Sequence, residues 1–471
     1  MDINKISFIA LIILSLPAIW PILTPGYFPM HDDTQVVRVD QMFKALGSGQ
    51  FPVRFVPDLG YGYGYPIFNF YNPLPYYFGA LFMFFGLDAL LATKVMFILP
   101  ILFSGLAMYW LTKRYFGPVA ALVSGVFYVY APYHAVEVYV RGAVAEYWAY
   151  AFIPLVIYAF LSRRQLLTVT SLALLILSHN LTAFMFIPFL VLLLILGQLE
   201  IRLIRSILLG LGLVAFFWLP ALAEQHLTRV PQMVQQQFNP LDHFVYPDQL
   251  WGSIWGYAGS ASGRADGLSF MIGKLHIIFT LFSLMLFFFS RKIIKSTRRF
   301  LLLVTCCLLL ALFMLLPISY LIWKNLPVLR FLQFPWRYLS FIALSTSILS
   351  GFVITRFPKV AWLLPVFIFY SIKFFQPQFT YPITVSELLT DEQVKWVVSA
   401  RSDEYLPKGF VVPQTRTQAL GPQNPANQVL VADLLKNTPV RTIANLVSLS
   451  ALVVLVLQFS HGRFPGRRGF N

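Results

Sequence analysis

Residues 301–316 read LLLVTCCLLLALFMLL, a stretch that contains no charged side chain. It is apolar on every face of a helix, whereas a strand of a membrane barrel would alternate polar and apolar residues. Similar apolar stretches recur along the chain, and each is long enough to cross about 30 Å of hydrocarbon as a helix. Because lipid offers no partner for backbone groups, such spans must be helical. The sequence therefore predicts an all-α polytopic membrane protein.

The composition supports this class. The chain is 58% hydrophobic and 11% charged, against roughly 45–50% apolar and about 25% charged residues in soluble proteins. We predict about twelve transmembrane helices, the first of which is expected to be a retained anchor rather than a cleaved leader. The predicted spans are 6–24, 89–112, 118–136, 146–162, 165–179, 181–198, 205–222, 271–290, 300–317, 336–354, 360–373 and 443–459. The apolar segment 74–87 is too short for a full crossing and is predicted to be an interfacial or re-entrant helix.

The distribution of charge gives the topology. With the N-terminus inside, the inner connections hold about half of the 35 basic residues but only Asp2 and Glu200 of the 19 acidic ones. The positive-inside rule predicts this asymmetry, so both termini are expected to be cytoplasmic. The basic clusters also explain the net charge of +16, because they would meet anionic lipid at the plasma membrane. No nucleic-acid partner is therefore predicted.

The long connections all fall outside: 25–88, 223–270 and 374–442. We expect a transmembrane catalytic module over residues 1–373, a small extracytoplasmic region over 374–442, and a last helix with a basic cytoplasmic tail over 443–471. The inner connections are short, and the sequence contains no GxxxxGK[ST] phosphate loop, which argues against an ATP-driven pump. Any chemistry is therefore expected in the outer connections.

An acidic pair follows the first span, in the sequence Met30-His31-Asp32-Asp33-Thr34. A carboxylate at the outer rim can act as a general base toward an acceptor hydroxyl, or can help to hold a divalent cation such as Mg²⁺ or Mn²⁺. A solvated helix N-terminus would use Asp and Thr in the same way. Asp32 and Asp33 are the candidate catalytic and metal residues, and His31 is a candidate substrate-binding neighbour.

The rest of the first outer connection alternates aromatic rings with glycine, proline and amides, as YGYGYP at 61–66 and FNFYNPLP at 68–75. Aromatic faces stack on sugar rings and amides bond to their hydroxyls. An aromatic belt at the lipid headgroups would have the same composition. The candidate sugar-binding residues here are Tyr65, Asn69, Tyr71 and Asn72.

Ionisable residues gather in the next outer connection. Glu137 and Arg141 are four residues apart, which places them on one face if the segment is helical. Together with Glu146 they form either a structural ion pair at the membrane edge or part of a substrate site. His179, at the outer end of a span, is explained either by a helix-to-helix hydrogen bond or by a ligand contact.

Basic residues near span ends are candidates for stabilising a departing phosphate. Arg337, beside Trp336, can hold a lipid phosphate as a bidentate donor, although snorkelling to the interface would look the same. Arg141 and Lys274 are the other two candidates. Glu404 and Tyr405, in the last outer connection, complete the predicted substrate-binding set.

The order of these features resembles the GT-C class of membrane glycosyltransferases: an acidic pair soon after the first span, a long aromatic first outer loop, and short inner loops. The segments FPWRY at 334–338 and EYLP at 404–407 look more specifically like a bacterial subgroup labelled 6-pyruvoyl-tetrahydropterin synthase-related membrane proteins. That label does not imply pterin chemistry.

The resemblance implies a GT-C-like bundle that transfers a sugar from a polyprenyl-phosphate donor to an envelope glycan, glycolipid or protein acceptor. It places the catalytic carboxylate on Asp32 or Asp33, with Asp33 preferred, and leaves open whether a divalent metal takes part. The alternatives are a polytopic transporter or lipid flippase and a non-catalytic envelope-assembly protein. A transporter would be expected to place paired charges near the bilayer midplane.

Overall fold

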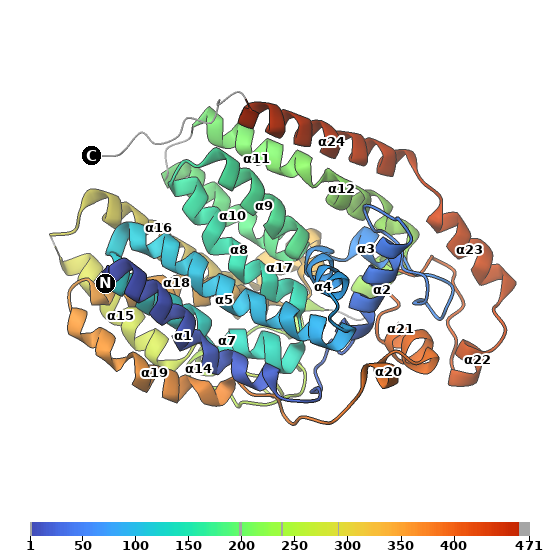
Figure 1. Cartoon of the computed structure of the whole chain (residues 1–471). Coiled ribbons are helices and arrows are strands. Elements are labelled where there is room, and N and C mark those ends of the chain that lie inside the picture. Colours follow the sequence, from blue (N-terminus) through green and yellow to red (C-terminus); the bar gives the residue numbers. More distant parts are fainter. Residues whose placement is uncertain (1, 197–199, 237–238, 291, 461–471) are drawn as a thin grey trace.

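Long apolar helices run next to one another along most of the molecule, and shorter helices gather at one end (Figure 1). The computed structural model describes residues 2–196, 200–236, 239–290 and 292–460. Within these residues, six helical segments are long and apolar enough to cross a membrane, or up to eight if each of two bent pairs is one span. The six are α1 (Ile3–Leu23), α5 (Ala89–Phe116), α8 (Val144–Leu161), α16 (Lys295–Leu315), Pro335–Ile354 and Pro425–Gln458.

These segments support a multi-pass membrane protein. Four shorter apolar helices complete the set: α4 (Leu74–Phe84), α9 (Gln165–Ser178), α10 (Asn180–Leu196) and α15 (Lys274–Phe289). Helix α4 occupies the segment predicted to be interfacial or re-entrant. The total of twelve spans and the cytoplasmic position of the termini stay predictions.

Two predicted spans are bent rather than straight. Helix α6 (Pro118–Val129) is followed by α7 (Pro132–Ala135) and a π-helix (Val136–Arg141), with a bend of 44° between the two parts. Proline interrupts a helix because it lacks a backbone N–H and its ring clashes with the preceding turn. Between α11 (Ile201–Leu213) and α12 (Ala215–Glu224) the bend is 68°.

The predicted span 360–373 is not a single helix. It consists of a 3-10 turn (Pro358–Leu363), the α-helix α19 (Leu364–Ser371) and a second 3-10 turn (Ile372–Phe374). At 1.5 Å per residue, an α-helix as short as α19 covers only about 12 Å. Apolar composition alone therefore overestimated the length of regular helix in this segment.

Glycines let the central helices approach closely. Where α5 meets α6, a Cβ on Gly125 would lie 3.1 Å from the carbonyl oxygen of Gly105. Where α18 (Leu339–Ile354) meets α6, a Cβ on Gly351 would lie 1.8 Å from the hydroxyl oxygen of Ser124. Close packing of small residues is a principal source of helix association in lipid, where burial of apolar surface provides no drive.

The other helices pack around this centre. Helix α1 lies on α5 and α6, α8 lies between α5 and α9, and α15 and α16 lie on α18. Helix α24 (Pro439–Ser460) packs on α11 and α12 at the edge of the bundle (Figure 1). The shorter helices at the crowded end are α2 (Gln35–Gly47), α3 (Ile67–Phe70), α20 (Val385–Leu388), α21 (Ser399–Arg401), α22 (Arg416–Leu420) and α23 (Pro425–Leu435).

The three long connections contact one another at this end. The backbones of Tyr27 and Tyr381 exchange two hydrogen bonds, of 3.0 and 2.9 Å, and a ring nitrogen of His31 lies 3.0 Å from the carbonyl oxygen of Tyr257. The connections therefore share one side of the bundle, as expected if all three are outside. The predicted domain boundaries stay predictions, and the tail 461–471 and the end of the span 181–198 lie outside the described residues.

We predict that single cysteines placed in the three connections will be labelled from outside the cell by a membrane-impermeant maleimide. Suitable exposed positions are Ser48, Ser262 and Gln378, in a background in which Cys306 and Cys307 are replaced by alanine. Ser296→Cys, in an inner connection, is the matched control and should react only after the membrane is permeabilised. Protection of any of the three from external reagent would contradict the topology.

Candidate functional site

Backbone hydrogen bonds fix the acidic pair against the end of the π-helix. The N–H of His31 donates to the carbonyl of Val140 at 3.0 Å, and the N–H of Asp32 donates to the carbonyl of Arg141 at 2.8 Å. The side chain of Gln35 donates to the carbonyl of Asp32 at 3.1 Å. The first outer connection is thus attached to the segment that carries the predicted Glu137–Arg141 pair.

A glycine allows this contact. Gly142 ends the π-helix with φ of +64°, a conformation that other residues rarely adopt. A Cβ at this position would lie 2.1 Å from the sulfur of Met30. A side chain on residue 142 would therefore push the Met30–Asp32 segment away from the bundle.

The two acids have different surroundings. The guanidinium of Arg401 lies 3.4 Å from the carboxylate of Asp33 and donates to its backbone carbonyl at 3.1 Å. Burial raises the pKa of Asp33, and the charge of Arg401 opposes that rise. Asp32 is exposed, and among the described residues no hydrogen bond or ion pair reaches its carboxylate. Asp32 is thus the acid that is available to a substrate.

Glu146 is the centre of a buried group of charges. One of its carboxylate oxygens accepts hydrogen bonds from Arg141 and Arg337, both at 2.9 Å, and the other accepts from the hydroxyl of Tyr133 at 3.1 Å. Arg141 also pairs with Glu137. The predicted helical spacing of that pair is confirmed, and Arg337, which is distant in sequence, extends the chain of ion pairs through Glu146.

The turn that carries Arg337 holds two buried N–H groups without a partner. Arg337 donates to the side chain of Gln333 at 2.8 Å, and another of its nitrogens lies 3.4 Å from a ring nitrogen of His179. The guanidinium of Arg141 lies 4.6 Å from the ring centre of Trp336. Over the described part of the chain, the Nε of Arg337 and the indole nitrogen of Trp336 have no hydrogen-bond acceptor. Buried donors are rarely left unpaired, so these two nitrogens are suited to an oxygen-rich ligand or to water.

Several predicted sugar-binding residues are used inside the protein instead. Asn69 is fully buried and donates to Glu224 at 2.9 Å. Asn72 is buried and donates to a backbone carbonyl of α9 at 3.1 Å. The hydroxyl of Tyr65 accepts the backbone N–H of Tyr405 at 3.1 Å. These contacts hold the aromatic connection to the bundle and leave little surface of the three side chains for a ligand.

A second polar group lies on α2, close to the acidic pair. Arg38 donates to the hydroxyl of Ser402 at 2.7 Å, and its guanidinium lies 4.7 Å from the ring centre of Tyr71. Ser402 donates to Glu404 at 3.2 Å. Burial raises the pKa of Glu404, against the opposing charge of Arg38. Arg38 and Arg401 were not among the predicted site residues. The only feature of the sequence that could have pointed to them is that they are basic residues in connections that are otherwise aromatic or polar.

The remaining predicted elements lie apart or are incomplete. Lys274 is exposed at the start of α15, with its ammonium 5.6 Å from the ring centre of Trp251. Within the described residues, no hydrogen bond or ion pair joins it to Asp32 or Asp33. No group of three or more His, Cys, Asp or Glu that could hold a metal occurs within the described residues. Arg401 engages Asp33, which leaves Asp32 as the exposed carboxylate of the acidic pair. In proteins Mg²⁺ is commonly held by one or two carboxylates together with substrate phosphates and water.

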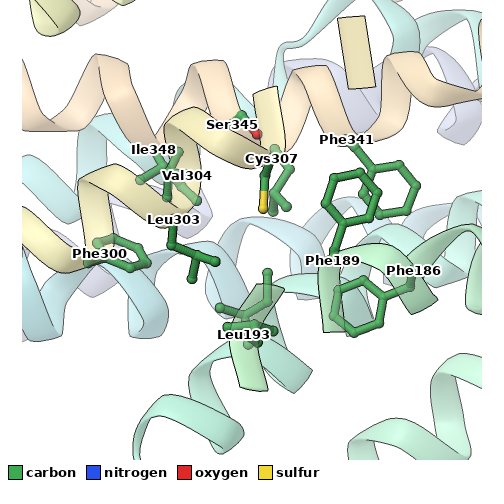
Figure 2. Close-up of a pocket in the computed structure, with 12 residues that line it drawn as sticks. Phe186, Phe189, Leu193, Phe300, Leu303, Val304, Cys307, Phe341, Ser345 and Ile348 are labelled. Atoms are coloured by element: carbon green, nitrogen blue, oxygen red, sulfur yellow. The ribbon is translucent and has the colours of Figure 1, made fainter. Parts of the chain in front are cut away.

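An apolar pocket lies inside the bundle, between α8, α10, α16 and α18 (Figure 2). Its volume is about 20 Å³. The rings of Phe189 and Phe341 stack on each other at one side of it, with their centres 4.2 Å apart, and Cys307 and Ser345 are among the residues that line it. A space of this size holds about one water molecule, so it is a packing space rather than a substrate site.

Comparison with known proteins gives a likeness of fold. No protein family model and no curated protein matches the sequence. The structure is similar to that of the arabinofuranosyltransferase AftD from mycobacteria, with a TM-score of 0.50 and 13% sequence identity. The match covers 79% of this chain and 26% of that enzyme, so the chain spans about a quarter of its length. A mutant form of the same enzyme matches with a TM-score of 0.48 and 13% identity, over 79% of this chain and 27% of the other.

At this level of sequence identity, the likeness is one of fold alone.

We predict that Glu146→Gln will lower the free energy of unfolding by about 3–5 kcal/mol, because it leaves the buried guanidinium of Arg337 without a carboxylate partner and leaves Arg141 with Glu137 alone. Denaturant-induced unfolding of the purified protein in detergent measures this change. Glu392→Gln is the matched control: its pair with Arg416 is 2.7 Å long but exposed, so a change below about 1 kcal/mol is expected. Equal losses in the two variants would contradict a special role for the buried group.

Proposed function

We propose that the chain is a membrane glycosyltransferase that moves a sugar from a polyprenyl-phosphate donor to an envelope glycan, glycolipid or protein acceptor outside the plasma membrane. The observation that carries the proposal is the exposed and unpaired carboxylate of Asp32, bonded through its backbone to Arg141. This arrangement supports the proposal, because the segment that carries Asp32 is attached to the segment that carries Arg141, and the bundle is similar in fold to a glycosyltransferase.

In the proposed reaction, Asp32 accepts the proton of the acceptor hydroxyl as that oxygen attacks the anomeric carbon of the donor sugar. The bond between the anomeric carbon and the phosphate oxygen breaks, and the configuration at that carbon is inverted. Negative charge grows on the departing polyprenyl phosphate and needs nearby donors. Arg141, Arg337 and the unpaired indole N–H of Trp336 are suited to this role.

The two acids receive different roles. Asp33 is paired with Arg401, so its lone pairs are partly engaged and its side chain is held in one orientation. Asp32 is free, and we therefore assign the base to Asp32 although the sequence analysis preferred Asp33.

The position of the charges favours an enzyme over a transporter or flippase. Glu146 is in the first turn of α8, Arg337 immediately precedes α18, and His179 caps the end of α9. All three therefore lie at helix ends rather than midway along a span. Lys94 is in the second turn of α5 and donates to the backbone carbonyl of Thr24 at 2.6 Å, so it too lies near a helix end. A transport path would need such groups near the bilayer midplane.

The narrower resemblance, to the bacterial subgroup, contributes two sequence segments to the proposal. Segment 334–338 supplies Trp336 and Arg337 to the phosphate side. Segment 404–407 supplies Glu404 and Tyr405, which follow closely after Arg401, the partner of Asp33.

We predict that Asp32→Asn will lower sugar transfer by about 10²–10⁴-fold, since the variant cannot take the acceptor proton, and that Asp33→Asn will have a smaller effect. Cells that lack the gene are complemented with each variant, and their envelope glycolipids and glycopolymers are compared by mass spectrometry. Binding of farnesyl phosphate to the purified variants serves as the control for folding and should be unchanged. Envelope glycans like those of the wild type, in cells that carry only the Asp32→Asn variant, would contradict the proposed mechanism.

A further inference from the structure

At the start of α2, two buried polar atoms have no hydrogen-bond partner within the described residues. Arg38 is 5% exposed and Thr34 is 4% exposed. Within the described residues, neither the Nε of Arg38 nor the hydroxyl of Thr34 makes a hydrogen bond. The residues are four apart, and their side chains therefore lie on one face where α2 begins. Unpaired buried donors at one place indicate that a ligand or water satisfies them.

Aromatic rings and a carboxylate surround the same place. The guanidinium of Arg38 lies over the ring of Tyr71, 4.7 Å from its centre, and Ser402 links Arg38 to Glu404. The ring of Tyr405 stacks on Phe70, with an angle of 14° and 5.4 Å between centres. Tyr71, Glu404 and Tyr405 are each partly exposed, so this group combines buried donors with accessible rings and an accessible acceptor.

The group also lies near the proposed base. Burial raises the pKa of the Tyr71 phenol, and the negative charge of Asp32 adds to that rise. The two side chains are thus within electrostatic reach of each other. Because Asp32 is hydrogen-bonded through its backbone to Arg141, it borders both the arginine pair proposed for the donor phosphate and the polar group on α2.

We propose that Arg38, Thr34, Tyr71, Glu404 and Tyr405 form the subsite that binds the acceptor sugar next to Asp32. This inference rests on the proposed function and deepens it. Sugar hydroxyls both donate and accept hydrogen bonds, so they match the donors Arg38 and Thr34 and the acceptor Glu404. The C–H face of a sugar ring fits against tyrosine. An anionic ligand would meet Glu404 and Asp32, and a cationic one would meet Arg38, so a neutral polyhydroxyl ligand fits best.

The test measures sugar binding and donor binding separately on the full chain in lipid nanodiscs. The acceptor probes are four methyl glycosides: α-arabinofuranoside, β-galactofuranoside, α-mannopyranoside and β-glucopyranoside. Saturation-transfer NMR measures their binding. Farnesyl phosphate is the donor-side probe. We expect at least one glycoside to bind the wild-type protein, and Glu404→Gln to weaken its binding by about tenfold or more through loss of a charged hydrogen-bond acceptor.

Conservative variants test the hydrogen bonds of the subsite with little change in side-chain size. Arg38→Lys retains the charge but loses the planar fork of donors, and it should weaken glycoside binding while farnesyl phosphate binding stays unchanged. Arg264→Lys is the matched control, because this exposed guanidinium lies 4.5 Å from the ring centre of Tyr246 in a similar stacked arrangement. It should change neither probe.

The two proposals fail in different ways. If farnesyl phosphate binds but no glycoside does, or if both Arg38→Lys and Glu404→Gln leave glycoside binding intact, the acceptor subsite is overturned and the proposed function stands. If farnesyl phosphate does not bind and Asp32→Asn leaves envelope glycans unaltered, both proposals fall.

Discussion

A charge that is buried in a helical bundle must be neutralised there, because neither lipid nor apolar side chains can solvate it. Glu146 meets this requirement for three separate elements. It joins α8 to Arg141 on the π-helix and to Arg337 on the turn before α18. Because the carbonyl of Arg141 also accepts the N–H of Asp32, the orientation of the exposed acid depends on this buried ion group.

The rest of the site is assembled by the long connections. Asp33 is held by Arg401, which belongs to the last connection, and His31 is held by the backbone of Tyr257 in the second. Each contact joins one connection to another through a side chain that is itself exposed to water. The surface around Asp32 therefore contains residues from three connections, and no single one of them would form it.

Much of the fold follows from the sequence, because a span needs only length and apolar composition. Helices α1, α5 and α16 begin or end within a few residues of their predicted bounds. Prediction failed where a local feature overrides composition, as at Pro132, where the apolar run bends, and in 360–373, where 3-10 turns flank the short α19. The bend and the 3-10 turns depend on backbone geometry, which the hydropathy of a sequence does not report.

The site was less predictable. Spacing gave the pair Glu137 and Arg141, since four residues on a helix fix two side chains on one face. The partnership of Glu146 with Arg337 joins residues 191 positions apart, and no periodicity reports it. Asn69 and Tyr65 have the composition of a sugar site, but an amide or a phenol serves equally well as an internal bond partner, and only the structure shows which.

The contact between Arg401 and Asp33 has a consequence for biogenesis. The two residues are separated by 368 positions, and the contact between Tyr405 and Tyr65 spans 340. A nascent chain emerges from the ribosome N-terminal part first, so the first acidic segment is synthesised long before the residues that bind it. The surface around Asp32 is complete only after residue 405 has been made, and a translation product that stops earlier carries the acids without these partners.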